Sequence, residues 1–155
     1  MSETGITVKM GKEAIFEVYE SLKTTPWYYS LYSTDVVIEN WGEYSKELGK
    51  AVAENGTLVR ELIAGLKIPV PYQEYFNGSD QEIRYLPPGS DINTDLIIYE
   101  NKVVIISYDP EMKVVTMEDQ GIFDMGKTMF DLLWEGTPEF IDVNSMLGLL
   151  NKSTT

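Results

Sequence analysis

Two arginines inside apolar segments are the side chains of this sequence best suited to gripping a ligand. Arg60 and Arg84 each have apolar neighbours, so each guanidinium needs a carboxylate, or must bury only its stem. One interpretation is a structural ion pair, with Glu61, Glu82 or a helix carboxylate as the partner. The other is a fork that binds an anionic or carbonyl ligand, or a dimer partner, through paired hydrogen bonds.

Aromatic residues gather in the first half of the chain, and their rings could bind a planar ligand or a sugar. The set is Trp27, Tyr28, Tyr29, Tyr32, Trp41, Tyr44, Tyr72, Tyr75 and Phe76. Tyrosine and tryptophan also fill cores and interfaces, so all three roles stay open. If a ligand cleft forms between the first strands and residues 69–76, we expect these residues to line it: Arg60, Arg84, Trp27, Tyr29, Tyr72 and Tyr75.

Four carboxylates, Glu61, Asp95, Glu100 and Glu118, could gather around a divalent cation, which prefers oxygen ligands. Their spacing matches no known metal loop, and the chain holds 25 acidic residues in all. Solvated charge in loops is therefore the simpler interpretation. We expect no metal and no cofactor.

The composition limits the chemistry further. The chain has no histidine and no cysteine, so it lacks the commonest general base, the commonest metal ligand and any thiolate nucleophile. Its net charge of −13 repels phosphate backbones, so we expect DNA contact only through an attached or separate domain. No apolar run is long enough for a membrane helix, and no signal peptide is evident, which predicts a cytoplasmic protein with no membrane partner.

Periodicity and breakers predict the elements that must position these side chains. A stripe of Ile15, Val18, Tyr19 and Leu22 predicts a helix over 11–24. Strand is expected at 27–32, at 36–38 or at both, and then a helix from an Asn40 N-cap to Asn55-Gly56. A strand at 57–64, a helical or irregular stretch at 69–78 and strands at 82–86 and 113–117 follow. The last elements expected are a helix at 119–134, with Ile122, Gly126, Met129, Phe130 and Leu133 on one face, and the start of a C-terminal helix at 137–139.

A hairpin is the strongest local signal. The apolar runs 96–99 and 103–106 flank Glu100-Asn101-Lys102, where Asn101 can supply the positive φ of a tight turn. Both runs are continuously apolar, which is typical of central strands covered on both faces. The whole pattern predicts a single α/β domain with a mixed sheet of about six or seven strands and helices on both faces.

The segment 82–134, with Leu58–Ile63 upstream, resembles the C-terminal effector domain of TrmB-like helix-turn-helix transcription regulators, which is similar to one half of the phospholipase D fold. The resemblance rests on the order of the strand 83–87, the hairpin 95–107, a further strand and the helix ending at Trp134. It implies an N-terminal segment at 1–10, an effector domain at 11–135 and a helical extension at 136–155. The apolar stripe of that extension could pack on its own domain or act as a dimer arm.

The resemblance also implies where a catalytic set would lie. Phospholipase D-type enzymes use His-x-Lys-x4-Asp, which falls on Asn93, Asp95 and Glu100 here. An amide replaces the nucleophile and a carboxylate replaces the cation that binds phosphate, so Coulomb repulsion opposes a phosphodiester. We therefore expect no catalytic residue and no enzyme.

The function that follows is a non-enzymatic regulatory domain that senses a small molecule, forms a homodimer, or does both, and that lacks its DNA-binding winged helix. The mechanism expected is a population shift, in which a ligand favours one dimer geometry and respaces the DNA-binding heads. A stand-alone acidic module that docks a basic protein is the alternative. A carboxylate-dependent hydrolase is a third.

Overall fold

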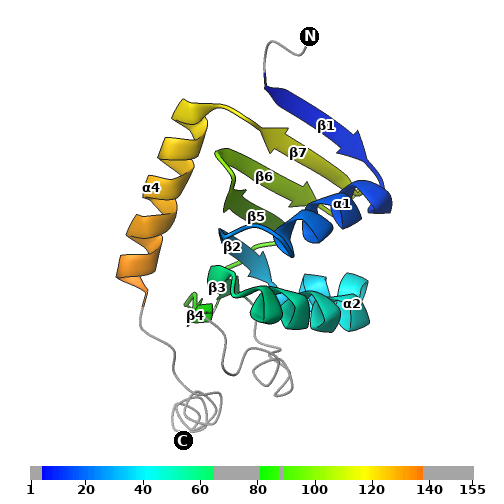
Figure 1. Ribbon diagram of the computed structural model, residues 1–155, viewed down its shortest axis with the longest axis horizontal. Coiled ribbons are helices and arrows are strands. Elements are labelled where there is room, and N and C mark those ends of the chain that lie inside the picture. Colours follow the sequence, from blue (N-terminus) through cyan, green and yellow to red (C-terminus); the bar gives the residue numbers. More distant parts are fainter. Residues whose placement is uncertain (1–4, 65–80, 88, 138–155) are drawn as a thin grey trace, which may run out of the picture.

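The computed structural model describes residues 5–64, 81–87 and 89–137, which form one seven-stranded mixed sheet with helices on both faces (Figure 1). The strands are β1 (Ile6–Met10), β2 (Trp27–Ser33), β3 (Leu58–Ala64), β4 (Gln81–Tyr85), β5 (Thr94–Tyr99), β6 (Lys102–Ser107) and β7 (Lys113–Met117). The helices are α1 (Lys12–Leu22), α2 (Thr34–Asn55) and α4 (Gln120–Gly136). None of the described helices is long and apolar enough to span a bilayer. The predicted α/β class is confirmed.

The order of the sheet is β1-β7-β6-β5-β2-β3-β4, with β2, β3 and β4 parallel and the other neighbours antiparallel. The predicted hairpin is confirmed as β5 and β6, which are joined by a two-residue turn. Asn101 has the expected positive φ of 59°, and Glu100 also has a positive φ, of 47°. Two consecutive positive φ values match the twist of a tight hairpin turn.

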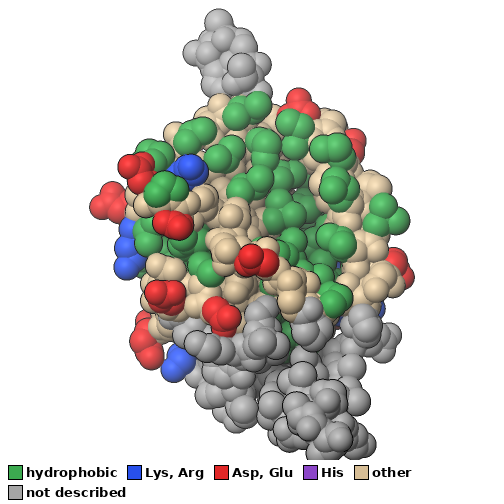
Figure 2. Space-filling model, turned by 180° about the vertical axis from the view of Figure 1, so that it is seen from behind, with side chains coloured by type: hydrophobic (Ala, Val, Ile, Leu, Met, Phe, Trp, Pro, Cys, Tyr) green, Lys and Arg blue, Asp and Glu red, His purple; other side chains and the backbone are tan. Residues whose placement is uncertain are grey.

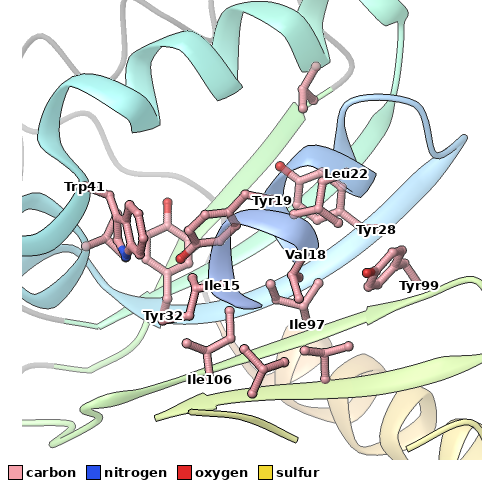
Figure 3. Packing of buried hydrophobic residues seen from close by; sticks show 14 of the residues in the cluster. Ile15, Val18, Tyr19, Leu22, Tyr28, Tyr32, Trp41, Ile97, Tyr99 and Ile106 are labelled. Atoms are coloured by element: carbon pink, nitrogen blue, oxygen red, sulfur yellow. The ribbon is translucent and has the colours of Figure 1, made fainter. Parts of the chain in front are cut away.

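Helices α1 and α2 cover one face of the sheet. The predicted stripe of α1 is confirmed, since Ile15, Val18, Tyr19 and Leu22 are all buried there. Figure 3 shows these side chains packed against Ile97 and Ile106 of the hairpin. This face carries the larger core and, as described below, a pocket.

The beginning of α2 corrects the predicted start of this helix. One or both of the segments 27–32 and 36–38 were expected to be strand, and Trp27–Ser33 is a strand, whereas Val36 and Val37 lie in α2, which begins at Thr34. Asn40 is not an N-cap, because its side-chain amide donates to the carbonyl of Val36 inside the helix. Val37 is buried on the side of α2 that packs on the core, and this burial outweighs the β-propensity of the segment. The predicted stop is confirmed, with Gly56 at φ 71° in the left-handed region.

Helix α4 covers part of the opposite face, and its buried side differs from the predicted one. Phe123, Phe130 and Trp134 are buried, whereas Met129 and Leu133 are exposed. The three aromatic rings follow the helical repeat at steps of seven and four residues and pack on the apolar side chains of the sheet. Two residues of the predicted face do contact the sheet side. Phe130 is fully buried, and Gly126 lies so close to β6 that a Cβ added to it would be 3.0 Å from Cγ2 of Val103.

The strand β1 was not predicted, because 1–10 was expected to be an opening segment without an element. It pairs with β7 in antiparallel register, with Val8 opposite Val115, and forms one edge of the sheet. All five of its residues are exposed, so no alternation of burial marks it. The predicted stretch at 69–78 and the C-terminal stripe from Phe140 onward lie outside the described residues.

Candidate functional site

A pocket opens between the sheet and the helices α1 and α2. It has about 540 Å³ of space that no protein atom fills, counted out through its open mouth into solvent. Its described lining consists mainly of aromatic, aliphatic and acidic side chains. They are Tyr19, Leu22, Tyr28, Ser30, Tyr32, Val37, Trp41, Tyr44, Ser45, Leu48, Gly49, Glu61, Asp95 and Ile97.

Strand alternation places the polar residues of this lining. Successive side chains of a strand point to opposite faces, so Tyr28, Ser30 and Tyr32 of β2 share the pocket face. In the sheet register Ser30 lies opposite Glu61 of β3 and opposite Ile97 of β5. The pocket floor is therefore formed by three adjacent strands, β3, β2 and β5.

Asp95 is the most strongly bonded acid of the pocket. It is 3% exposed, and its Oδ2 accepts hydrogen bonds from the hydroxyls of Tyr108 at 2.6 Å and Tyr19 at 3.1 Å. Burial raises the pKa of Asp95 to about 6, although the two tyrosine hydroxyls act in the opposite direction by stabilising the carboxylate. Its other oxygen, Oδ1, is buried with no hydrogen-bond partner among the described residues.

The two tyrosines belong to a network that spans both helices. The hydroxyls of Tyr19 and Tyr108 lie 3.0 Å apart, and the indole Nε1 of Trp41 donates to Tyr108 at 3.2 Å. Burial, followed by the charge of Asp95, raises the pKa of Tyr19 and of Tyr108 well above the ordinary value. Both hydroxyls therefore stay protonated and remain donors. Figure 3 shows Tyr19 beside Trp41, whose rings meet edge to face at 5.5 Å.

Glu61 is the second buried acid, on β3 near the middle of the sheet. It is 4% exposed, and its Oε2 accepts a hydrogen bond from the Tyr32 hydroxyl at 3.0 Å. Burial raises the pKa of Glu61 to about 7, against the smaller lowering by that bond. Strands β3 and β5 flank β2, and Asp95 is two residues along β5 from Ile97, which is in register with Ser30 and Glu61, so the backbones at Glu61 and Asp95 are roughly 12 Å apart. The salt bridges of the described residues are made by other acids and leave both carboxylates without a basic partner.

These positions correct the interpretation of the carboxylates as solvated loop charge. Glu61 and Asp95 are buried in one pocket, whereas Glu100 and Glu118 are exposed and belong to the hairpin turn and to the end of β7. No set of three or more acidic residues placed to hold a metal ion occurs among the described residues. The pocket offers negative charge, acceptor oxygens and aromatic rings.

The positions aligned with the phospholipase D motif are not gathered into a site. Asn93 is exposed just before β5, and Glu100 is exposed just after it, so the strand separates them by roughly 20 Å. Asp95 alone points into the pocket. The residue that the resemblance places at the phosphate-binding lysine is thus a buried acid bonded by tyrosine hydroxyls.

The predicted ligand-binding residues that the structure describes lie together, but on the α4 face. The guanidinium of Arg84 stacks on the Trp134 ring at 4.4 Å and donates to the backbone carbonyls of Trp134 and Thr137 at the end of α4. Arg60 lies 5.3 Å from the Trp134 ring and 5.5 Å from the Tyr29 ring. The expected carboxylate pairing is replaced by aromatic rings and helix-end carbonyls.

The rest of the predicted set divides in two. Trp27 and Tyr29 contact each other at 4.9 Å, and Tyr29 stacks on Phe130 of α4. Tyr72 and Tyr75 lie outside the described residues. Of the early aromatic residues, Tyr28, Tyr32, Trp41 and Tyr44 line the pocket instead.

Sequence reasoning missed the pocket residues Ser30 and Tyr19, and Tyr108 that bonds to Asp95 beside them, as a polar set. Tyr19 was assigned to the apolar stripe of its helix, and its bond to Asp95 joins residues 76 positions apart, which periodicity does not reveal. One signal was present. Glu61, with Arg60 beside it, interrupts a strand whose other residues are apolar, and an acid at such a position is either buried in a pocket with polar partners or exposed at an edge.

The sequence matches no known protein-family model and no curated protein, but the structure resembles several solved ones. TrmBL2, described as an archaeal chromatin protein with a novel mode of DNA binding, is 18% identical with a TM-score of 0.62; the match covers 90% of this chain and 56% of TrmBL2. NucT from Helicobacter pylori is 11% identical with a TM-score of 0.65, covering 87% and 98% of the two chains.

A third similar structure is the phospholipase D family member Nuc from Salmonella typhimurium, 14% identical with a TM-score of 0.59, covering 88% of this chain and 98% of Nuc. At these identities the likeness concerns the fold. Within that fold, this chain spans little more than half the length of TrmBL2 and nearly the whole length of the two Nuc-type proteins. The chain has a phospholipase D-like fold.

Proposed function

We propose that the chain is a non-catalytic regulatory domain of a transcription regulator, which binds a small molecule in the pocket and dimerises, and which reaches DNA only through an attached or separate domain. The similarity to TrmBL2, a protein described as binding DNA, supports the regulatory assignment. The net charge of −13 supports the assignment of DNA contact to another domain.

The buried Asp95 at the position of the phosphate-binding lysine is the observation that carries this proposal. A phosphodiester enzyme needs positive charge there, and this position instead holds an acid that two tyrosines keep in place. The nucleophile position, Asn93, is exposed and carries an amide. Among the described residues that line the pocket, none is histidine, lysine or arginine, the side chains that phosphodiester chemistry of this type uses.

A surface for dimerisation lies on the α4 face of the sheet. In the register of β1 with β7 and β6, the side chains of Ile6, Val8 and Met10 share the face of Met117, which packs toward α4. Val8 is 58% exposed. We call this set, with the exposed apolar residues of the helix, the apolar surface: Ile6, Val8, Met10, Met125, Met129, Leu132 and Leu133.

Figure 2 shows hydrophobic side chains gathered broadly on the side of the molecule opposite to the view of Figure 1. Large exposed apolar patches are typical of protein interfaces. A second copy of the chain fits this apolar surface, because a twofold axis lets one apolar patch cover its own counterpart.

Sedimentation of the purified chain tests the dimer. We expect a dimer whose dissociation constant rises by at least about tenfold in Val8→Glu, because the new charge must be buried. Thr24→Glu introduces the same charge at an exposed position beyond α1 and should leave the dimer intact. A monomer at every accessible concentration would refute this part of the proposal.

A thermal-shift screen of metabolites tests the sensing pocket. A true effector should raise the melting temperature of the wild type. Ser45→Phe, which fills the lining of the pocket from α2, should abolish that rise, while Lys50→Phe on the exposed side of the same helix should keep it. Absence of any pocket-dependent ligand, together with capture of a basic protein by the acidic surface, would favour the alternative of a stand-alone interaction module.

A further inference from the structure

We infer that the ligand of the pocket is a small protonated amine, held by Asp95 and Glu61 and packed against aromatic rings. The inference rests on the proposed sensing function, since it names the chemical class that this same pocket would take. It goes beyond that function because the fold and its similar structures specify no ligand for such a pocket.

The charge of the lining gives the first argument. Of the described residues that line the pocket, two are acids and none is lysine or arginine. Lys12 lies 5.0 Å from the Trp41 ring and Lys23 lies 5.2 Å from the Tyr44 ring, and no salt bridge of the described residues joins either lysine to Asp95 or Glu61. An anionic ligand would meet uncompensated repulsion, whereas a cation supplies the charge that both acids lack.

Unused hydrogen-bond acceptors give the second argument. Asp95 Oδ1 and the hydroxyl of Ser30 are buried in this pocket, and neither has a hydrogen-bond partner among the described residues. Buried polar atoms are rarely left unpaired in folded proteins, and each such atom is costly. An ammonium group carries three N–H donors and no acceptor, so it matches a carboxylate oxygen and a hydroxyl oxygen together.

The aromatic walls give the third argument. Tyr19, Trp41 and Tyr44 lie within 6.2 Å of one another as tilted or edge-on pairs at the helix side of the pocket. The faces of tyrosine and tryptophan rings attract cations, and such rings also cover the hydrocarbon part of an amine. The contacts of Lys12 and Lys23 show that ammonium groups already lie over two of these rings.

Proton linkage makes the inference measurable. The groups facing Asp95 are the hydroxyls of Tyr19 from α1 and Tyr108 after β6, and the group facing Glu61 is the Tyr32 hydroxyl from β2. Burial raises the pKa of Asp95 to about 6 and that of Glu61 to about 7, so both acids are largely protonated at pH 5. An ammonium favours the ionised form of each, so binding releases protons and affinity falls as the pH falls through this range.

The experiment compares amines with neutral molecules of the same shape. The probes are 2-phenylethylamine with 2-phenylethanol, and 1,4-diaminobutane with 1,4-butanediol, titrated by calorimetry into the full chain at pH 8 and pH 5. We expect an amine to bind at pH 8, its alcohol counterpart to bind at least about tenfold more weakly, and the amine to lose about tenfold in affinity at pH 5. Calorimetry in two buffers of different ionisation enthalpy should show proton release.

Substitutions place the binding in the pocket rather than on the acidic surface. Asp95→Asn and Glu61→Gln remove the charge while keeping the shape of the side chain. At least one of them should lower the affinity for the amine by about tenfold or more. Glu82→Gln makes the same change at an exposed position on β4 and should have no effect. Ser30→Ala removes an unpaired hydroxyl and serves as a second pocket variant that leaves both acids unchanged.

Two outcomes overturn the inference, and they differ in what they say of the proposed function. If neutral molecules bind as well as amines and Ser45→Phe abolishes that binding, the pocket senses ligands but the amine class is wrong. If amines bind equally to wild type, Asp95→Asn and Glu61→Gln, the amine contacts only the surface charge. Failure of every ligand in the wider metabolite screen would refute the sensing function itself.

Discussion

The two faces of the sheet hold charge in opposite ways. The α1 and α2 face buries two acids, Asp95 and Glu61, which are bonded only by tyrosine hydroxyls. The α4 face holds the two arginines, Arg60 and Arg84, over the ring of Trp134. Arg60 and Glu61 are neighbours in sequence, yet strand alternation points them to different faces, so they cannot neutralise each other. The arginines therefore help to hold α4 on one face, whereas the two acids on the other face have no basic partner among the described residues.

Removing the ring that both arginines share is expected to give the largest effect. Trp134 is 2% exposed, and Trp134→Ala leaves a cavity and withdraws the contact of two guanidinium groups. We expect the free energy of unfolding to fall by about 3–5 kcal/mol, measured by urea denaturation. Glu135→Gln, at an exposed position on the same helix outside the apolar surface, should change it by less than about 0.5 kcal/mol. Equal effects would mean that α4 is held by other contacts.

Charge removal on the pocket face should stabilise the protein in a pH-dependent way. Burial raises the pKa of Glu61 above its ordinary value of 4.5 to about 7, so the folded state binds more protons than the unfolded state between these values. The contribution of Glu61 to stability therefore decreases as the pH rises through this window. Glu61→Gln does not titrate, so its stability relative to wild type should improve by about 2 kcal/mol from pH 5 to pH 8.

Urea denaturation of both proteins at the two pH values measures this change. Glu82→Gln is the matched control, because it makes the same substitution at an exposed position, and its difference from wild type should not vary with pH. A pH-independent difference for Glu61→Gln would show that this acid is hydrated in solution, and the contrast between the two faces would then weaken.

A smaller effect is expected from one hydroxyl of the network. Tyr108→Phe removes the 2.6 Å hydrogen bond to Asp95, so the pKa of Asp95 should rise further above about 6, and the free energy of unfolding should fall by about 1 kcal/mol. The carboxyl chemical shift of Asp95 in an NMR titration reports the pKa. Tyr99→Phe removes a hydroxyl bonded to Ser21 instead and should leave that pKa unchanged.

An effect of similar size on stability, with none on the pocket, is expected at the start of α4. The side chain of Asp119 accepts a hydrogen bond from the backbone N–H of Ile122, so Asp119→Ala should lower the free energy of unfolding by about 1 kcal/mol. Glu135→Ala, at an exposed position of the same helix, should have a lesser effect. Amine binding should be unchanged in both variants, and a loss of binding in Asp119→Ala would show that the two faces are energetically coupled.

Local signals were sufficient to predict most of the fold. The hairpin β5–β6, the strand β3 and the stripe of α1 each carry their pattern within a short window, and each is confirmed. The predicted start of the second helix was wrong, because burial of Val37 overrides the β-propensity of its segment. The strand β1 was missed because its partner β7 is more than a hundred residues away and its exposed face looks unlike a core strand.

The candidate site was predicted less completely than the fold. Alignment with the phospholipase D motif singled out Asp95, but the acid at Glu61 was assigned to solvent, and the bonded tyrosines were not connected with either. Tyr19, Tyr108 and Trp41 come from three separate parts of the chain, so only the folded chain brings the two tyrosine hydroxyls to Asp95 and the indole of Trp41 to Tyr108. The exposed Asn93 and Glu100 show that motif spacing alone does not build a site.

The alternation within β2 and β3 has a mechanical consequence. Ser30 and Glu61 line the pocket, while their immediate neighbours Tyr29 and Arg60 contact the rings of α4. Only one peptide unit separates a pocket side chain from a side chain that supports α4. If a bound molecule displaces these two strands, Tyr29 and Arg60, which contact α4, move with them. The position of α4, and with it the apolar surface, would then shift.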